Sequence, residues 1–108
     1  MNQEVSQIGG GYPPKGTEHE RLTAELIKLT RAVSANRERF EASGRGSIHD
    51  DPTEMRLKGE IQAIGERLDG IGGWGAMITA CDEVEDTVGF MGGVVLNYAW
   101  DGIGRWAA

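Results

Sequence analysis

The chain has 108 residues, of which 17 are acidic and 11 basic, giving a formal net charge of −6. This length fits one small domain, and the acidic balance argues against direct nucleic-acid binding, which needs a basic face to neutralise phosphates. The single cysteine excludes an intrachain disulfide, and the polar N-terminus does not resemble a secretory signal. We therefore expect a cytoplasmic protein.

Residues 1–16 are expected to form a flexible arm. The arm is polar, passes through three glycines and ends in Tyr12-Pro13-Pro14-Lys15-Gly16. Because paired prolines favour an extended backbone, Tyr12 is expected to be presented outside any helix. Residues 17–108 are expected to form a single helical domain.

The first helix is predicted over residues 17–42. Thr17 and Glu20 form a capping box, which satisfies two free amides at a helix start. Apolar residues then recur at spacings of three and four, which is typical of a stripe that packs against a partner helix. This seam comprises Leu22, Leu26, Leu29, Val33, Asn36 and Phe40. Asn36 is the polar member of this seam. It is either a protein-interface residue that fixes register or partner number, or a residue at the rim of the core.

The second helix is predicted over residues 51–69, with Asp51 as N-cap and Pro52 in the first turn. Its apolar seam comprises Leu57, Ile61, Ile64, Leu68 and Ile71. Two capped helices with matching seams predict an antiparallel helical hairpin. Gly59 and Gly65 each cost about 1 kcal/mol relative to alanine, so we expect another backbone to approach closely at both.

One or two shorter helices are predicted after the hairpin, over residues 74–88 and 90–100. The first has an apolar side that includes Cys81 and an outer side with four acidic residues, Asp82, Glu83, Glu85 and Asp86. No segment alternates in the manner of a strand, so the predicted fold class is all-α. The weakly charged residues 87–104 lack a continuous apolar run of about 18 residues, so no membrane span is expected.

Four aromatic residues in the C-terminal part, Trp74, Tyr98, Trp100 and Trp106, form either a small core or an interface. Their number favours a core, while Trp106 remains a candidate interface residue. Gly89 and Gly93 are expected to allow close packing within the chain.

No group of residues predicts catalysis or metal binding. The adjacent side chains of His49, Asp50 and Asp51 point in divergent directions, and a helix start explains the acids without a metal. Cys81 lies on an apolar helix side and is followed by acids that disfavour a thiolate. The sequence therefore predicts a protein that is not an enzyme and has no cofactor.

The arm motif Tyr12-Pro13-Pro14-Lys15-Gly16, followed by Glu20-Arg21 on a helix, resembles the start of a family of small phage proteins. These are helical-hairpin proteins that sequester cyclic nucleotide messengers of bacterial defence, of the anti-CBASS and anti-Thoeris type. The ending, residues 100–106, is similar to the endings of uncharacterised prophage proteins.

The resemblance implies a homo-oligomer with ligand-binding residues in the arm and the first helical turn. Tyr12 would stack on a base beside Pro14, and Lys15 or Arg21 would meet a phosphate. The location implied is the cytoplasm of the host cell. The leading hypothesis is therefore a non-enzymatic phage-type protein that antagonises host defence by sequestering a nucleotide messenger.

Two alternatives remain open at the level of sequence. In the first, the acidic outer side binds a basic surface of a host protein, such as a nuclease complex or a repressor. In the second, the chain builds a structural helical oligomer of a phage or mobile element.

Overall fold

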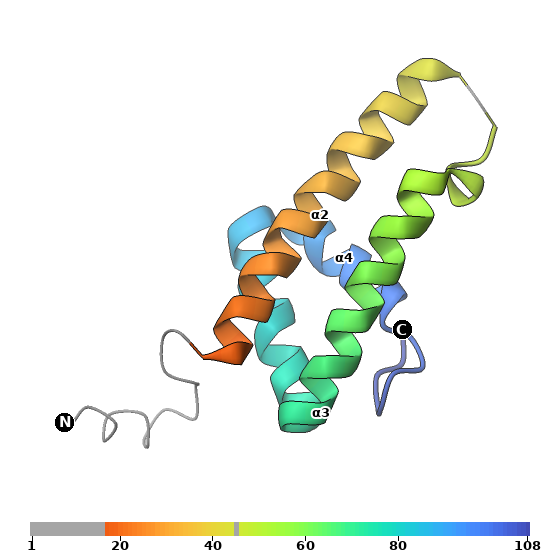
Figure 1. The fold of residues 1–108 in the computed structure, drawn as a ribbon. Helices are drawn as coiled ribbons and strands as arrows, with labels where there is room; N and C mark the ends of the chain where they lie inside the picture. Colours follow the sequence, from red (N-terminus) through yellow and green to blue (C-terminus); the bar gives the residue numbers. More distant parts are fainter. Residues whose placement is uncertain (1–16, 45) are drawn as a thin grey trace.

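The computed structural model describes residues 17–44 and 46–108, and every regular element within them is helical. The elements are α2 (Glu18–Ser43), the 3₁₀ helix η2 (Ile48–Asp50), α3 (Pro52–Val88) and α4 (Phe90–Ala99). The predicted all-α class and helical hairpin are confirmed, because α2 packs along the first part of α3 (Figure 1). The predicted arm, residues 1–16, lies outside the described residues.

Both hairpin helices begin at the caps that the sequence indicates. The Thr17 hydroxyl accepts a hydrogen bond from the Glu20 amide at 3.2 Å, and the Asp51 carboxylate accepts one from the Glu54 amide at 3.0 Å. Helix α2 ends at Gly44, whose φ of 70° lies in the left-handed region that favours glycine. Side-chain caps therefore define where the two antiparallel helices start, and the backbone conformation of Gly44 defines where the first one stops.

The hairpin is held together by the predicted apolar seam. Leu26, Ile61 and Leu68 have no exposed surface. Burying a side chain of this size stabilises the fold by about 1.5–3 kcal/mol. The seam ends before its last predicted member, since Ile71 remains 39% exposed where the chain begins to turn away. The two helices are thus joined by residues whose spacing alone identified them.

An exposed ion pair ties the start of α2 to the far part of the hairpin. The Arg67 guanidinium donates to both carboxylate oxygens of Glu18, at 2.5 and 2.8 Å. These hydrogen bonds, with the positive charges of Arg67 and Arg21, lower the pKa of Glu18. Because solvent screens an exposed pair, it orients the helices more than it stabilises them.

Helix α3 consists of two limbs that meet at one residue. Gly73 has φ 67° and ψ −156°, a conformation outside the helical region, and the chain turns sharply there (Figure 1). The sequence predicted a helix end at Gly70 and a new helix from Trp74. The helix instead continues past Gly70, and the break is confined to Gly73. We call residues 52–72 the first limb and residues 74–88 the second limb.

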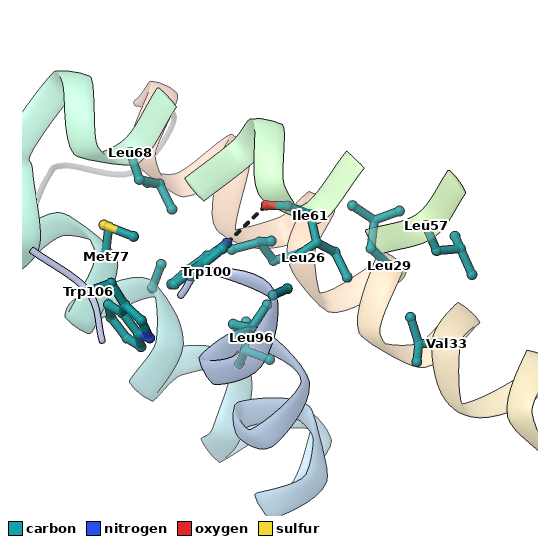
Figure 2. Close-up of a cluster of buried hydrophobic side chains, with 13 residues drawn as sticks. Leu26, Leu29, Val33, Leu57, Ile61, Leu68, Met77, Leu96, Trp100 and Trp106 are labelled. Carbon is teal, nitrogen blue, oxygen red and sulfur yellow. Dashed lines mark hydrogen bonds between the residues drawn. The ribbon is translucent and has the colours of Figure 1, made fainter. Parts of the chain in front are cut away.

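Helix α4 packs across the hairpin, and Trp100, which follows its last turn, is the largest of the fully buried side chains in the described part of the chain. The Trp100 side chain is fully buried, and its indole nitrogen donates a hydrogen bond to the Ile61 carbonyl at 2.9 Å (Figure 2). A methyl group on Gly65 would lie 2.4 Å from that indole nitrogen. The absence of a side chain at Gly65 therefore creates the space that Trp100 fills.

The expectation for the two helical glycines of the first limb is corrected by this packing. Gly65 does allow a close approach, but the approaching group is an indole ring rather than another backbone. Gly59 is exposed, and no atom lies within 4 Å of the position that an alanine methyl group would take there. Gly59 therefore allows no close approach within the described part of the chain. Sequence spacing gave both glycines the same role because it cannot identify their neighbours.

Among the described residues, no helix combines the length and the apolar character needed to cross a bilayer.

Candidate functional site

A pocket lies where α4 meets the hairpin, and we call it the α4 pocket. Its volume is about 430 Å³. Its lining comes from α2, η2, the first limb of α3 and α4, and comprises Val33, Arg37, His49, Glu54, Met55, Lys58, Gly59, Ile61, Gln62, Val94, Val95, Tyr98 and Ala99. Pockets of this size accommodate small organic ligands, especially where a few polar groups surround an apolar floor.

A hydrogen-bonded polar network supports one wall of the α4 pocket, and it lines the pocket through Arg37 and Glu54. The Asn36 amide donates to the Asp51 carboxylate at 3.0 Å and to Glu54 at 3.5 Å. The Arg37 guanidinium donates to Glu54 at 2.6 and 3.0 Å. Asn36, Asp51 and Glu54 are each at most 7% exposed, so these bonds satisfy polar groups that burial would otherwise leave without partners. This wall is therefore fixed in position before any ligand arrives.

The remaining polar side chains of the pocket are Lys58, His49, Tyr98 and the neutral amide of Gln62. Lys58 and His49 are exposed at its rim, and Tyr98 leaves 67% of its surface open to solvent. Within the lining, the charges of Arg37 and Glu54 offset each other, and Lys58 adds a positive charge at the rim. An exposed ring beside a lysine is an arrangement that suits a planar anion.

A second pocket, of about 330 Å³, lies between the start of α2 and the second limb of α3. Its lining includes the carboxylates of Glu20 and Glu83 and the ring of His19. The His19 Nε2 lies 3.0 Å from the Ala76 carbonyl, so the ring donates a hydrogen bond to that oxygen. With two carboxylates on its walls, this pocket repels an anionic ligand.

Three of the four residues expected to bind a ligand lie outside the described part of the chain. Tyr12, Pro14 and Lys15 lie outside the described residues. Arg21 is exposed on the first turn of α2, next to Glu20 of the acidic pocket. It is absent from the lining of the α4 pocket. Arg21 therefore lies on a different part of the surface from Lys58 and Tyr98.

The six residues expected at a protein interface fall into three environments. Asp82, Glu83 and Asp86 are exposed on the second limb. Glu85 is half-buried, and its carboxylate packs over Gly93 of α4. The other two are buried inside the chain: Asn36 in the polar network, and Trp106 with 7% of its surface exposed.

Of the four aromatic residues predicted to form a small core or an interface, two lie in the core and two at the surface. The rings of Trp100 and Trp106 meet edge to face with centroids 5.0 Å apart, and the Trp106 indole donates to the Asn97 carbonyl at 3.1 Å. Trp74 is 46% exposed beneath the Arg105 guanidinium, which lies 5.9 Å from the ring centroid. The core prediction is therefore right for Trp100 and Trp106 and wrong for Trp74 and Tyr98.

Cys81 is held in its protonated form. Burial raises the pKa of its thiol to about 11, and the negative charges of Glu85 and Asp82 add to the effect. A thiol with so high a pKa is a poor nucleophile at neutral pH. Within residues 17–44 and 46–108, no three side chains of His, Cys, Asp or Glu gather so that they could hold a metal ion.

Sequence analysis missed Lys58, His49 and Tyr98 as a set. These residues come from different elements, and no spacing along the chain relates them. The available signal was the position of Lys58 beside the seam residue Leu57, which brings its side chain near the helix that packs there.

Comparisons with protein-family models, with curated proteins and with solved structures found no match in any of the three.

Proposed function

We propose that this protein is a non-enzymatic binding protein that sequesters a nucleotide-type messenger, with the ligand seated in the α4 pocket. The observation that carries the proposal is the combination of Lys58, His49 and the exposed Tyr98 ring around one pocket of about 430 Å³. The resemblance of the N-terminal arm to phage proteins that sequester cyclic nucleotides supports the same ligand class. Tyr12, Pro14, Lys15 and Arg21 remain predicted contacts from that resemblance.

The chemistry of the pocket suits the two halves of a nucleotide. A base can stack on the face of Tyr98, because every base presents a planar π surface. A phosphate can accept hydrogen bonds from Lys58 and from His49 at the rim. The apolar floor formed by Val33, Ile61 and neighbouring side chains offers a surface against which the base can pack. In the wall, the Arg37 guanidinium offsets the charge of the Glu54 carboxylate.

Isothermal titration calorimetry of the full chain against cyclic mononucleotides, cyclic dinucleotides and linear dinucleotides tests this proposal. We expect at least one of these compounds to bind. Lys58→Ala and Tyr98→Ala should each weaken that binding about 10- to 100-fold, because charged hydrogen bonds and base stacking each contribute about 1.5–3 kcal/mol. Lys28→Ala is the matched control, since Lys28 is an exposed lysine on α2 that does not line the pocket.

Two results would overturn the proposal. One is the absence of binding across the whole panel. The other is binding that Lys58→Ala and Tyr98→Ala leave unchanged while Tyr12→Ala or Lys15→Ala removes it, which would move the site to the arm. Chromatography of the ligand after incubation tests sequestration itself, because a sequestering protein releases the compound chemically unchanged on denaturation.

A further inference from the structure

Helix α4 has an apolar face that nothing in the described part of the chain covers. Phe90, Met91 and Tyr98 are 71%, 57% and 67% exposed. They recur with Val94 at spacings of three and four residues, so they lie on one side of the helix. The opposite side carries Leu96, Gly92 and Ala99, which are buried. The helix contains no charged residue.

The uncovered surface is extensive for a chain of this size. Met55, on the first limb, is 59% exposed and borders the α4 pocket together with Tyr98. Side chains of these types present about 200 Å² each when free, so the four together expose roughly 500 Å². Two such surfaces pressed together approach the total of about 1,000 Å² that a specific interface needs.

The charges beside this face indicate what covers it. On one side of the apolar face of α4, the Glu85 side chain packs against Gly93, and Asp86 is exposed nearby on the second limb. On the other side, Lys58 shares the α4 pocket with Val95. A partner with a single sign of charge would be repelled on one of these sides, and an anionic lipid surface would be repelled by the acids. A second copy of the chain brings acidic and basic sides of its own, so a two-fold pairing can set opposite charges against each other.

We infer that two copies of this protein associate through α4, with Phe90, Met91, Val94 and Tyr98 at the centre of the interface. The contact surrounds a two-fold axis and leaves the hairpin seam intact within each copy. It also brings the second copy over the mouth of the α4 pocket, because Tyr98 and Val94 belong to both surfaces. The inference goes beyond the proposed function and does not require that the pocket binds a nucleotide.

Sedimentation velocity of the full chain without added nucleotide tests the inference. We expect a reversible monomer–dimer equilibrium in the micromolar range, consistent with a small interface. Phe90→Lys and Met91→Lys should each weaken dimerisation at least tenfold, since each would bury a charge at the interface. Ile71→Lys is the matched control: Ile71 is an exposed apolar residue of the first limb that does not line the α4 pocket, and its replacement should leave the dimer unchanged.

A cross-linking experiment tests the same interface without weakening it. In a Cys81→Ser background, Val94→Cys places one thiol near the proposed two-fold axis, and mild oxidation should give a covalent dimer. Far-UV circular dichroism and the thermal midpoint of each variant establish that the helices remain folded. Where Phe90→Lys fails to fold, Phe90→Ser replaces it.

Three results would overturn the inference. The first is a protein that stays monomeric at millimolar concentration, and the second is a dimer that Phe90→Lys and Met91→Lys leave unaffected. The third is a monomer that binds phosphatidylcholine vesicles in a flotation assay and loses this binding in the same two variants. A chain that dimerises only after residues 1–16 are deleted would also count against it, because the arm would then be the occupant of this face. Nucleotide titrations do not enter this test, so a failed α4 pocket and a failed dimer are distinguishable.

Discussion

Two glycines in the first limb of α3 differ in how much space surrounds them: Gly65 is closely packed, and Gly59 is open. Gly65 faces the indole of Trp100 at a distance that leaves no room for a methyl group. Gly59 faces open space. Both residues add the same flexibility to the unfolded chain, so only their neighbours in the folded state distinguish them.

Replacing each glycine by alanine should therefore change stability in opposite directions. Gly59→Ala should raise the free energy of unfolding by up to about 1 kcal/mol, because alanine favours the helix and meets no obstacle. Gly65→Ala should lower it by about 1–3 kcal/mol, because the new methyl displaces Trp100 and its hydrogen bond to Ile61. Urea unfolding followed by circular dichroism measures both. Equal effects of the two substitutions would contradict the packing described for Trp100.

At this scale the sequence predicted what depends on near neighbours and missed what depends on distant ones. The caps at Thr17 and Asp51 were identified because each cap and its amide are three residues apart. The function of Asn36 was left open between two interpretations, because its partners Asp51 and Glu54 are 15 and 18 residues away. Spacing placed Asn36 on the seam, and only the fold supplied the carboxylates that it contacts.

At the scale of the element, the second helix shows how much of a boundary depends on backbone conformation. Gly70, Gly72 and Gly73 lie where the sequence predicted a break, and Gly75 follows at the start of the next predicted helix. Of these four residues, Gly73 alone has positive φ, and the others continue the helix. Composition located the turn to within a few residues. It could not select the one glycine, because all four are conformationally permissive.

The conformation of Gly73 predicts a contrast with Gly75. Gly73→Ala should destabilise the fold by about 1–3 kcal/mol, because φ 67° with ψ −156° is a region that side chains disfavour. Gly75→Ala should be neutral or stabilising, since a methyl group there meets no atom within 4 Å and the backbone is helical. Thermal unfolding of the two variants measures the difference. A Gly73→Ala variant as stable as the wild type would mean that the turn does not require this conformation.

At the scale of the whole molecule, the fold class and the hairpin were predictable, whereas the α4 pocket was not. Leu26 and Ile61 were identified as core residues because a helical repeat concentrates apolar residues on one side. The α4 pocket combines residues from four elements, and their meeting depends on the direction α4 takes after Gly89. A sequence pattern that describes each helix separately cannot supply that direction.

Trp106 stabilises the position of α4 by packing against Trp100 and donating a hydrogen bond to Asn97. Trp106→Ala should lower the free energy of unfolding by about 3–5 kcal/mol, because the ring is buried against Trp100. This loss is a large part of the roughly 5–15 kcal/mol that holds a typical domain together. Trp74→Ala is the matched control and should cost less than about 1 kcal/mol, since its ring is 46% exposed. Guanidinium titration measures both, and equal losses would place Trp106 outside the core.

The perpendicular pair of tryptophan rings should also give the folded protein a distinctive spectroscopic signal. Trp100 and Trp106 lie in a dry environment 5.0 Å apart, so their emission should be blue-shifted and their transitions coupled in circular dichroism. Trp74 meets solvent and should be quenched readily by acrylamide. A Trp74→Phe variant would then emit only from the buried pair. Its spectrum would report whether the C-terminal segment remains docked, without an added dye.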